Sequence, residues 1–590
     1  MDDDGMRKMA AQFYAHLFAS EGTTNGERVL QHIEEAVTDE MNAKLGAPFT
    51  DEEIEQALFQ MGPTKAPGPD DLPAMFYQRH WVLVKDDVSG AVREFLAGTA
   101  APNGFNDTII VMIPKVKAPE LLAQFRPISL CNVLYKIAVK ALANHLKMVL
   151  PFMISDKHSA FVPGRLITDN VLVAYGCVHA IRKRKRRKPM CAIKLDMMKA
   201  YDRVEWDFLE KMLLKFGLSD HWTEMVMRCV KTATFTVKLN GGLFKRFHPT
   251  RGLRQGDPLS LYLFLFCVEG FSALLKATQR EKNIKGVPFG SGGPTVTHFL
   301  FADDNVVFVE GSRESFEALR HILLDYGMAS GQKVNLQKSA VFFGKGTLDD
   351  DKNELKQVLE ITEEALSERY LGLPTMVGRS KDGTFKYVKE SAKGKVSGWK
   401  GQGLSKMARE VLVKSGLQST PTFTMSCFQL TKKICGNLSS ISSNFWWGET
   451  DGHKKVHWVG WDRMCMRKHE RGLGFRDPEA FNQAMLAKQA WRLLQVSESL
   501  CGRVLRARYY PDGTILNATC PDGGSFTFRS ILHRRDLLMD GLIWHIGNGS
   551  QVKIHHGNWI PRSGSLRPLG QLYMAGITPV GDLLEGDGRS

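Results

Sequence analysis

Two short apolar arms enclose a pair of adjacent aspartates at residues 299–309, and this pattern constrains the fold more than any other segment. The arrangement predicts a tight β-hairpin with Asp303 and Asp304 at its tip. Like charges at a hairpin tip repel each other, so a bound cation is the natural compensation, and hard carboxylate oxygens suit Mg²⁺ or Mn²⁺. Aspartate pairs elsewhere, at residues 70–71, 86–87 and 349–351, lie in polar surroundings where solvation is a sufficient explanation.

A further candidate acid, Asp196, ends a strand-like segment at residues 190–196. The two-residue period of a strand places Cys191, Ile193 and Leu195 on a face that we expect to be buried, with Asp196 on the opposite, polar side. An amphipathic helix is expected to follow and to stop at Gly217.

Asp202 and Glu205 stand three residues apart after that strand and resemble a helix-starting capping pair. We therefore interpret Asp202 as structural and keep Asp196 for chemistry.

Asp196 and the hairpin pair, which begins 107 residues later, match the donor set of two-metal phosphoryl transfer. That chemistry needs carboxylates that clamp two ions about 3.5 to 4 Å apart. The spacing alone leaves three interpretations open: nucleotidyl transfer, a purely structural hairpin, and metal-dependent hydrolysis.

Composition narrows the class of protein. At 590 residues the chain has room for about four domains of roughly 150 residues, with 43% hydrophobic and 24% charged residues as in soluble proteins. The net charge of +15 favours a polyanionic partner, nucleic acid above all. The ten cysteines lack zinc-ligand spacing, which favours a reducing compartment.

No apolar run approaches the roughly 20 residues that span a bilayer, and aspartates occupy positions 2–4 where a secretory signal would be positive. We expect a nuclear or cytoplasmic protein, neither secreted nor in a membrane.

The pattern along the chain predicts four regions. Residues 1–60 are an amphipathic helical linker segment, and 61–70 are a loop rich in proline and glycine. Short β-rich runs alternate with helical patterns from 109 to 343, which marks a mixed α and β domain. Charged helices follow at 346–440. Residues 441–590 are rich in tryptophan, and we interpret these rings as core anchors, with stacking platforms for bases as the alternative.

Several motifs occur in a fixed order, and together they resemble the reverse transcriptases of plant LINE-type (non-LTR) retrotransposons. The resemblance covers most of the chain, from about residue 10 to the end. The motifs are Lys65-Ala-Pro-Gly-Pro-Asp70, Ile113-Pro-Lys115, Phe125-Arg-Pro-Ile-Ser-Leu130, Ser159-Ala-Phe-Val-Pro-Gly-Arg165, Lys194-Leu-Asp-Met-Met-Lys-Ala-Tyr-Asp202, Arg251-Gly-Leu-Arg-Gln-Gly-Asp-Pro-Leu259, Phe301-Ala-Asp-Asp304, Gly331-Gln-Lys-Val-Asn335 with Lys338, and Tyr370-Leu-Gly-Leu-Pro374.

The resemblance implies an α+β right-hand polymerase, with fingers and palm at 61–345, the palm carrying an antiparallel sheet. A thumb or connection at 346–440 and a mainly helical C-terminal region follow. It implies that Asp196, Asp303 and, less directly, Asp304 hold two Mg²⁺ or Mn²⁺ ions. It also implies that Lys338 is the general acid for pyrophosphate departure, with a solvated lysine as the alternative.

For the incoming nucleotide, the resemblance implies that Tyr201 is a gate against the ribose 2′-hydroxyl and that Lys115 and Arg126 grip the triphosphate. The alternative for the two basic residues is an ordinary surface position. Gln255 and Gly256 would approach the templating base and the nucleotide, and Asp257 would start the helix that follows.

Nucleic-acid contacts are expected at Arg165, at Arg251 and along an unbroken basic run. The run is also a candidate nuclear import signal, and a solvated loop is the alternative. Its members are Arg182, Lys183, Arg184, Lys185, Arg186, Arg187 and Lys188.

Four positions depart from the family pattern: Asp71 stands where glycine is usual, His158 where glutamine is usual, Met198 where serine is usual, and Leu261 where proline is usual. Asp71 adds negative charge near nucleic acid, and Leu261 relaxes the turn after the base-contacting motif, so reduced activity is expected. The endonuclease and RNase H regions of full-length relatives are expected to be missing, as in a truncated element.

Two functions follow as hypotheses. The first is an RNA-directed DNA polymerase that uses an RNA template, a DNA primer or target, and deoxynucleoside triphosphates, with no membrane and no identifiable protein partner. The second is a catalytically silent, maturase-like remnant that binds RNA through a basic surface.

Overall fold

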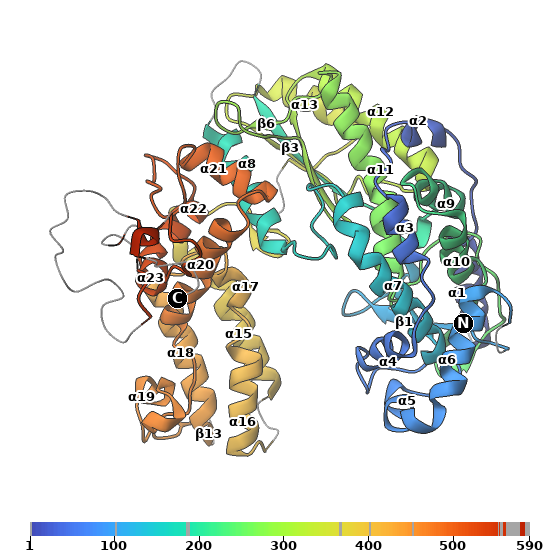
Figure 1. The fold of residues 1–590 in the computed structure, drawn as a ribbon, viewed down its shortest axis with the longest axis horizontal. Helices are drawn as coiled ribbons and strands as arrows, with labels where there is room; N and C mark the ends of the chain where they lie inside the picture. Colours follow the sequence, from blue (N-terminus) through green and yellow to red (C-terminus); the bar gives the residue numbers. More distant parts are fainter. Residues whose placement is uncertain are drawn as a thin grey trace. The chain divides into compact units, whose positions relative to one another are not determined.

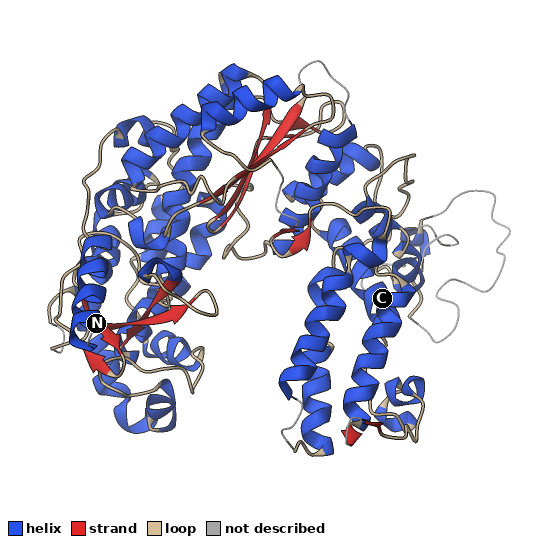
Figure 2. Cartoon of the chain, turned by 180° about the vertical axis from the view of Figure 1, so that it is seen from behind, coloured by secondary structure: helices blue, strands red, loops and turns tan. Residues whose placement is uncertain are grey.

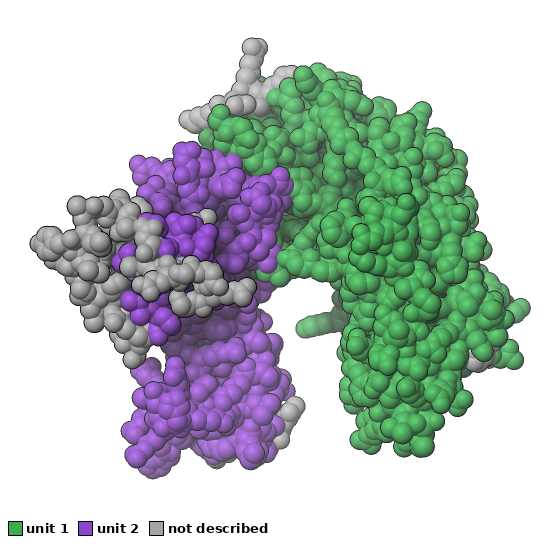
Figure 3. Space-filling model, viewed as in Figure 1, with its two compact units in different colours: residues 1–376 green, residues 377–590 purple. Residues whose placement is uncertain are grey.

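The computed structural model describes residues 3–100, 103–183, 189–364, 369–399, 403–450, 453–550, 552, 554, 558–561 and 579–583. The chain divides into two compact units, residues 1–376 and 377–590 (Figure 3). The divisions predicted at residues 60, 345 and 440 stay predictions.

Unit 1 mixes helices with two main sheets, as the sequence predicts (Figures 1 and 2). Its helices are α1 Asp3–Leu17, α2 Gly26–Leu30, α3 Asp39–Leu45, α4 Asp51–Phe59, α5 Ala74–Arg79, α6 Trp81–Ala97, α7 Val133–Met153, α8 Ile167–Lys183, α9 Trp206–Lys215, α10 Asp220–Lys231, α11 Ser260–Arg280, α12 Arg313–Ser330 and α13 Asp349–Leu359. Its strands are β1 Asp107–Pro114, β2 Phe125–Cys131, β3 Met190–Asp196, β4 Thr234–Leu239, β5 Gly242–Leu243, β6 Val287–Pro288, β7 Thr295–Val296, β8 His298–Phe301, β9 Asp304–Glu310, β10 Ala340–Phe343, β11 Arg369–Tyr370 and β12 Leu373–Pro374.

The sheet β10-β3-β9-β8 carries the acids, and every neighbouring pair in it is antiparallel. Cys191, Ile193 and Leu195 of β3 are fully buried, which confirms the predicted apolar face. β8 and β9 form the predicted hairpin. The predicted antiparallel sheet is therefore present.

A second sheet, in the order β2-β1-β4-β5, lies apart from the first (Figure 2). Its β1–β4 pair is parallel, and α1 covers it through a separate apolar cluster that includes Tyr14, Phe18, Ile110 and Phe235. The N-terminal segment thus packs as part of unit 1.

The helices of unit 1 bury one continuous apolar core against the first sheet. α9 presents Phe208, Leu209, Met212 and Leu213 to it, and the chain turns at Gly217 with φ of 90°, as predicted. α11 is long and apolar enough to cross a bilayer, but 78% of its apolar window is buried inside the protein. Core packing is therefore a sufficient explanation for its apolar character.

Unit 2 is mainly helical. Its elements are α14 Lys381–Thr384, α15 Lys386–Trp399, α16 Lys406–Leu412, α17 Thr422–Met425, α18 Lys432–Trp447, β13 Glu449–Thr450, β14 His453–Lys454, α19 Trp461–Cys465, α20 Pro478–Gln495, α21 Leu500–Tyr509, α22 Phe526–Leu532 and α23 Arg535–Gly541. Its tryptophans differ in burial. Trp446 is buried with its ring edge on Phe475, and Trp461 stacks on the same ring. Trp458 is 81% exposed and Trp544 is 50% exposed. Core anchoring therefore explains only some of these rings.

Candidate active site

Asp196 and Asp304 lie side by side, because they are Cα partners where β3 and β9 pair. Opposed residues in an antiparallel pair have Cα atoms about 4.5 to 5.5 Å apart. Asp303 lies in the two-residue turn between β8 and β9, and Asp304 is the first residue of β9. All three acids therefore lie at one end of the sheet. The structure thus brings Asp196 to a pair of aspartates that follow it by more than a hundred positions in the sequence.

The carboxylates at this end of the sheet repel one another. Burial raises the pKa of the Asp304 carboxyl, and the carboxylates of Asp303 and Asp196 raise it further. Lys194 opposes these effects with its Nζ 3.7 Å from Asp304 Oδ1. Among the described residues, Lys194 is the one cation that forms an ion pair with these three carboxylates, so the site can accept additional positive charge.

The carboxylates fit a divalent cation by their chemistry, since hard oxygen donors and uncompensated repulsion both favour one. As they stand, no three His, Cys, Asp or Glu side chains among the described residues are close enough to hold a metal ion together. Binding therefore requires side-chain rotation, which the exposed Asp303 and half-buried Asp304 permit.

Asp196 is fixed by a loop that sequence reasoning did not assign to it. The Asn335 amide Nδ2 donates to Asp196 Oδ2 at 3.3 Å, and the Asn335 backbone N–H donates to the Asp196 carbonyl at 2.7 Å. Ser339 Oγ accepts from the Asp196 N–H at 3.2 Å. Asn335 lies inside a recognised motif, which was the available signal for this supporting role.

Three basic residues predicted for the nucleotide or the leaving group lie near one another. Lys115 follows β1, Arg126 lies on β2 beside it, and both are exposed, as is Lys338. Partial burial lowers the pKa of Lys115, the positive charges of Lys338 and Arg126 lower it further, and the carboxylates of Asp202 and Asp196 act in the opposite direction. These predicted residues therefore share one electrostatic environment with Asp196, and together they suit a polyphosphate.

Tyr201 stands next to the hairpin tip. Its half-buried ring stacks on Phe264 with centroids 4.4 Å apart, and burial together with the Asp303 charge raises the pKa of its hydroxyl. Packing on Phe264 thus holds the ring rigidly beside the acids.

Gln255 and Gly256 form a turn against β2. Gly256 has φ of 115°, and a Cβ there would stand 3.1 Å from the Ser129 carbonyl oxygen, so the turn requires glycine. The Gln255 Nε2 donates to Asp202 Oδ1 at 2.8 Å. Without a ligand, this amide is therefore held by the protein.

The capping role predicted for Asp202 is wrong. Asp202 is fully buried in a short 3₁₀ turn, and Glu205 precedes α9 without a side-chain capping bond. Asp202 Oδ2 has no hydrogen-bond partner among the residues that the structure describes. Burial raises the pKa of Asp202 to about 6, although the charges of Lys199, Lys115 and Arg203 oppose the shift.

The predicted role of Asp257 is close to what the structure shows, since its Oδ1 accepts from the Leu259 N–H just before α11.

Asp202→Asn should stabilise the protein at pH 8. The unfolded carboxyl ionises near 3.8 and the folded one near 6, so the penalty for ionising it in the folded state is absent below pH 3.8, grows between these values and is complete above 6. Two pKa units correspond to about 3 kcal/mol as an upper bound. Urea unfolding at pH 8 and pH 4 tests this, and equal gains at both pH values would contradict it.

The Arg251 guanidinium is buried and engaged within the protein, which does not favour the nucleic-acid contact predicted from the sequence. The side chain is 2% exposed and pairs with Glu205 at 3.3 Å and with Glu21 at 3.2 Å, while its Nε donates to the Leu17 carbonyl. A buried guanidinium needs such partners, and they consume its donors.

Arg165 is also committed to the protein. It donates to the backbone carbonyls of Pro151, Ile154, Ser155 and His158. Its predicted nucleic-acid contact is therefore not available in this structure.

Of the basic run, Arg182 and Lys183 are exposed at the end of α8. The remaining members, at 184–188, lie outside the described residues.

The four departures have different structural settings. Asp71 has φ of 54°, a left-handed conformation that suits the expected glycine better. Met198 is 42% exposed, and His158 is fully buried. Leu261 lies in the first turn of α11, where proline is also tolerated, so the expectation that leucine relaxes the turn after the motif stays a prediction.

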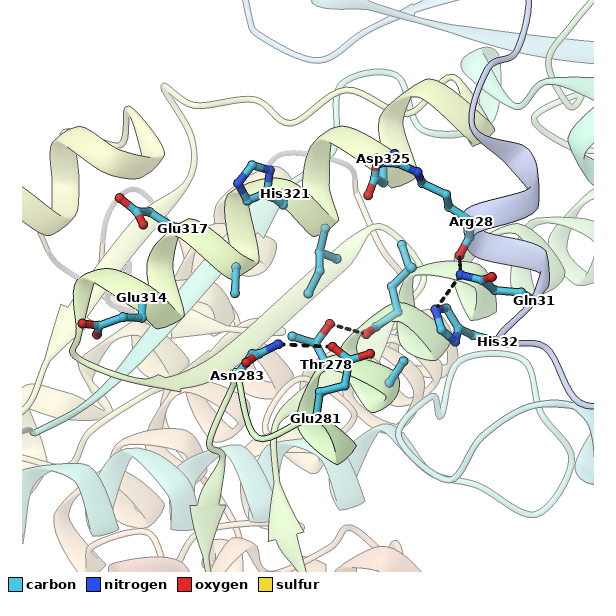
Figure 4. Close-up of a pocket in the computed structure, with 14 residues that line it drawn as sticks. Arg28, Gln31, His32, Thr278, Glu281, Asn283, Glu314, Glu317, His321 and Asp325 are labelled. Atoms are coloured by element: carbon cyan, nitrogen blue, oxygen red, sulfur yellow. Dashed lines mark hydrogen bonds and ion pairs between the residues drawn. The ribbon is translucent and has the colours of Figure 1, made fainter.

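A surface cavity of about 550 Å³ lies between α2, α11 and α12 (Figure 4). Arg28 and Asp325 pair at 3.3 Å on its wall, and Glu317 and His321 also line it. No residue predicted for catalysis is among the described residues that line it, so the cavity is separate from the acidic site.

Residues 113–375 match the family described as reverse transcriptase (RNA-dependent DNA polymerase). An uncharacterized mitochondrial protein of Arabidopsis thaliana is 40% identical over 150 residues, which is 25% of this chain and 97% of the relative.

Two relatives come from transposable elements. An uncharacterized 149 kDa protein of transposon TX1 from Xenopus laevis is 26% identical over 479 residues, 80% of this chain and 35% of the relative. A retrovirus-related Pol polyprotein of retrotransposable element R2 from Popillia japonica is 24% identical over 293 residues, 50% of this chain and 39% of the relative. The chain thus spans little more than a third of these two relatives.

Proposed function

We propose, from the premise that this chain belongs to the reverse transcriptase family, that it extends the 3′ end of a DNA strand along an RNA template. The class of enzyme is RNA-directed DNA polymerase, a nucleotidyltransferase, and the relatives are proteins of non-LTR retrotransposons. The observation that carries the proposal is the pairing of Asp196 with Asp304, together with the exposed Lys115, on which the charges of Asp196 and Arg126 both act. The first sheet is then the palm, and the second belongs to the fingers.

The reaction is in-line attack of the primer 3′-hydroxyl on the α-phosphate of a deoxynucleoside triphosphate, with pyrophosphate leaving. Asp196, Asp303 and Asp304 would hold two Mg²⁺ or Mn²⁺ ions, which supply charge neutralisation at the reacting phosphate and activation of the hydroxyl. Asn335 keeps the Asp196 carboxylate oriented.

Lys115 and Arg126 bind the triphosphate, Lys115 as a point charge and Arg126 as a two-pronged donor. Lys338, which lies close enough to Lys115 to lower its pKa, gives a proton to the departing pyrophosphate. The Gln255 side-chain amide, which donates to Asp202 here, would give up or share that hydrogen bond when the nucleotide and the template bind.

Tyr201→Ala should admit ribonucleotides. The ring stacked on Phe264 leaves no room for a 2′-hydroxyl, and its removal opens that space. We expect the preference for deoxynucleotides to fall on the order of a hundredfold, roughly 3 kcal/mol. Tyr201→Phe keeps the ring and is the matched control. Unchanged sugar discrimination in Tyr201→Ala would remove the gate role.

Primer extension by the purified chain tests the proposal as a whole. With an RNA template, a DNA primer, deoxynucleotides and Mg²⁺ or Mn²⁺, we expect template-directed incorporation. Salt-dependent RNA binding without any incorporation would instead favour the catalytically silent, RNA-binding alternative.

A further inference from the structure

The segment from Ser155 to Arg165 forms hydrogen bonds along the free edge of β8, in the hairpin that carries Asp303. The Leu300 N–H donates to the Lys157 carbonyl at 3.0 Å, and the Ser159 N–H donates to the Leu300 carbonyl at 3.3 Å. His158 and Leu300 thus form a parallel bridge. The edge of β8 is therefore covered by a loop that is far from it in the sequence.

The His158 ring reaches the turn that carries Asp303. Its Nε2 accepts from the Ala302 N–H at 3.3 Å, and the imidazole is fully buried. Because a backbone amide only donates, the ring proton must sit on Nδ1, for which the described part of the chain offers no hydrogen-bond partner. A buried donor without a hydrogen bond costs about 1 to 3 kcal/mol, so His158 carries a local penalty while it accepts the Ala302 hydrogen bond.

Ala302 needs an external partner. Its φ of 54° lies in the left-handed region, which costs a residue other than glycine roughly 1 to 2 kcal/mol. The hydrogen bond from the Ala302 N–H to His158 offsets that cost. It also sets the direction in which the backbone enters Asp303. If the turn relaxed, Asp303 would move away from Asp196 and Asp304.

Arg165 fixes the loop beneath His158. Its guanidinium bonds to the carbonyls of His158 and Ile154, both at 2.6 Å, to that of Pro151 at 3.3 Å, and also to that of Ser155. Four carbonyls converge on one side chain, so the loop has little freedom. The contacts run in series from Arg165 through His158 and Ala302 to Asp303.

We propose that Arg165 and His158 are positioning residues for nucleotidyl transfer: Arg165 fixes the loop, and His158 holds the hairpin tip so that Asp303 stands beside Asp196 and Asp304. The inference rests on the proposed function, because it assigns these residues to the same site. Neither residue touches a substrate in this scheme.

His158→Leu removes the acceptor, and His158→Gln replaces it with an amide oxygen of similar reach. For His158→Leu we expect kcat for single-nucleotide incorporation to fall about a hundredfold, the cost of displacing a reacting group by about 1 Å. KM for the nucleotide should change less than about twofold, because the triphosphate contacts are elsewhere. His158→Gln should recover most of kcat.

His145→Leu is the matched control. His145 is also buried, but it bonds to Glu53 and to the Leu45 carbonyl, away from the hairpin. This variant should lose stability without losing kcat in its folded fraction. An equal fall in kcat at His145, or full kcat in His158→Leu, would overturn the positioning role.

Amide hydrogen exchange of residues 299–305 separates this inference from the polymerase assignment, because it needs no activity. The Ala302 amide should be protected in the wild type and in His158→Gln, and should exchange at least about tenfold faster in His158→Leu. An unprotected Ala302 amide in the wild type would overturn the inference whether or not the variants fold. If the Ala302 amide is protected but the wild type incorporates no nucleotide, the proposed function is contradicted and the positioning inference is not.

Arg165→Lys distinguishes a loop anchor from a nucleic-acid contact. Lysine keeps the charge but cannot reach four carbonyls, so exchange at Ala302 should rise and kcat should fall, while the salt dependence of RNA binding stays the same. Unchanged exchange with weaker RNA binding would return Arg165 to the nucleic-acid surface and overturn its positioning role.

Discussion

Asp303→Asn is expected to lower the rate of primer extension by at least about a thousandfold. A carboxylate that holds a catalytic cation contributes several kcal/mol of transition-state charge stabilisation, and about 4 kcal/mol corresponds to that factor. The side chain is exposed at the hairpin tip, so the amide should not disturb the core. RNA binding should stay nearly intact, because it depends on basic residues. Single-turnover incorporation of one nucleotide measures the effect.

Asp350→Asn provides the matched control, since it makes the same change at an exposed aspartate of a different acidic run. We expect wild-type rates from it. If Asp303→Asn extended a primer as fast as Asp350→Asn, the hairpin tip would have no part in catalysis.

Arg251→Met is expected to destabilise unit 1 by about 3 to 5 kcal/mol, the usual cost of removing one partner of a buried ion pair. Glu205 would be left buried, with its side chain 3% exposed and its charge uncompensated on that side. The loop at residues 17–21 would also lose the Nε bond to Leu17 and the pairing with Glu21. Urea unfolding followed by circular dichroism measures the loss.

The double variant Arg251→Met with Glu205→Gln should recover much of that stability, because the two side chains share one interaction and their effects are not additive. RNA affinity of the folded single variant should match the wild type. A stable Arg251→Met protein with weakened RNA binding would restore the nucleic-acid role that the sequence suggested.

Local pattern was enough to predict the elements that carry the acids. The apolar face of residues 190–196 and the two apolar arms around Asp303 are both set within a few residues, and both are confirmed, although Ala192 on the opposite face of the strand is buried as well. The convergence of Asp196 with Asp304 was inferred from chemistry, and the register of β3 against β9 confirms it.

The polar residues inside motifs were harder to interpret, because their environment is set by tertiary packing. Arg251 and Arg165 have the composition of nucleic-acid contacts, yet burial against Glu205 and against four carbonyls commits them to the fold. Asp202 is similar, since no sequence pattern reveals that its neighbours exclude water. The hydrogen bond from Ala302 to His158 joins segments 144 positions apart.

Cleavage of the backbone by Fe²⁺ bound in place of Mg²⁺ tests most directly whether the three acids form one cation site. Hydroxyl radicals formed at the ion cut the chain within a few ångströms. We expect two sets of fragments, one ending near Asp196 and one near Asp303, both suppressed by excess Mg²⁺ and both absent in Asp196→Asn. Cuts near only one of these positions, or cuts that excess Mg²⁺ leaves unchanged, would contradict a shared site and the polymerase chemistry built on it.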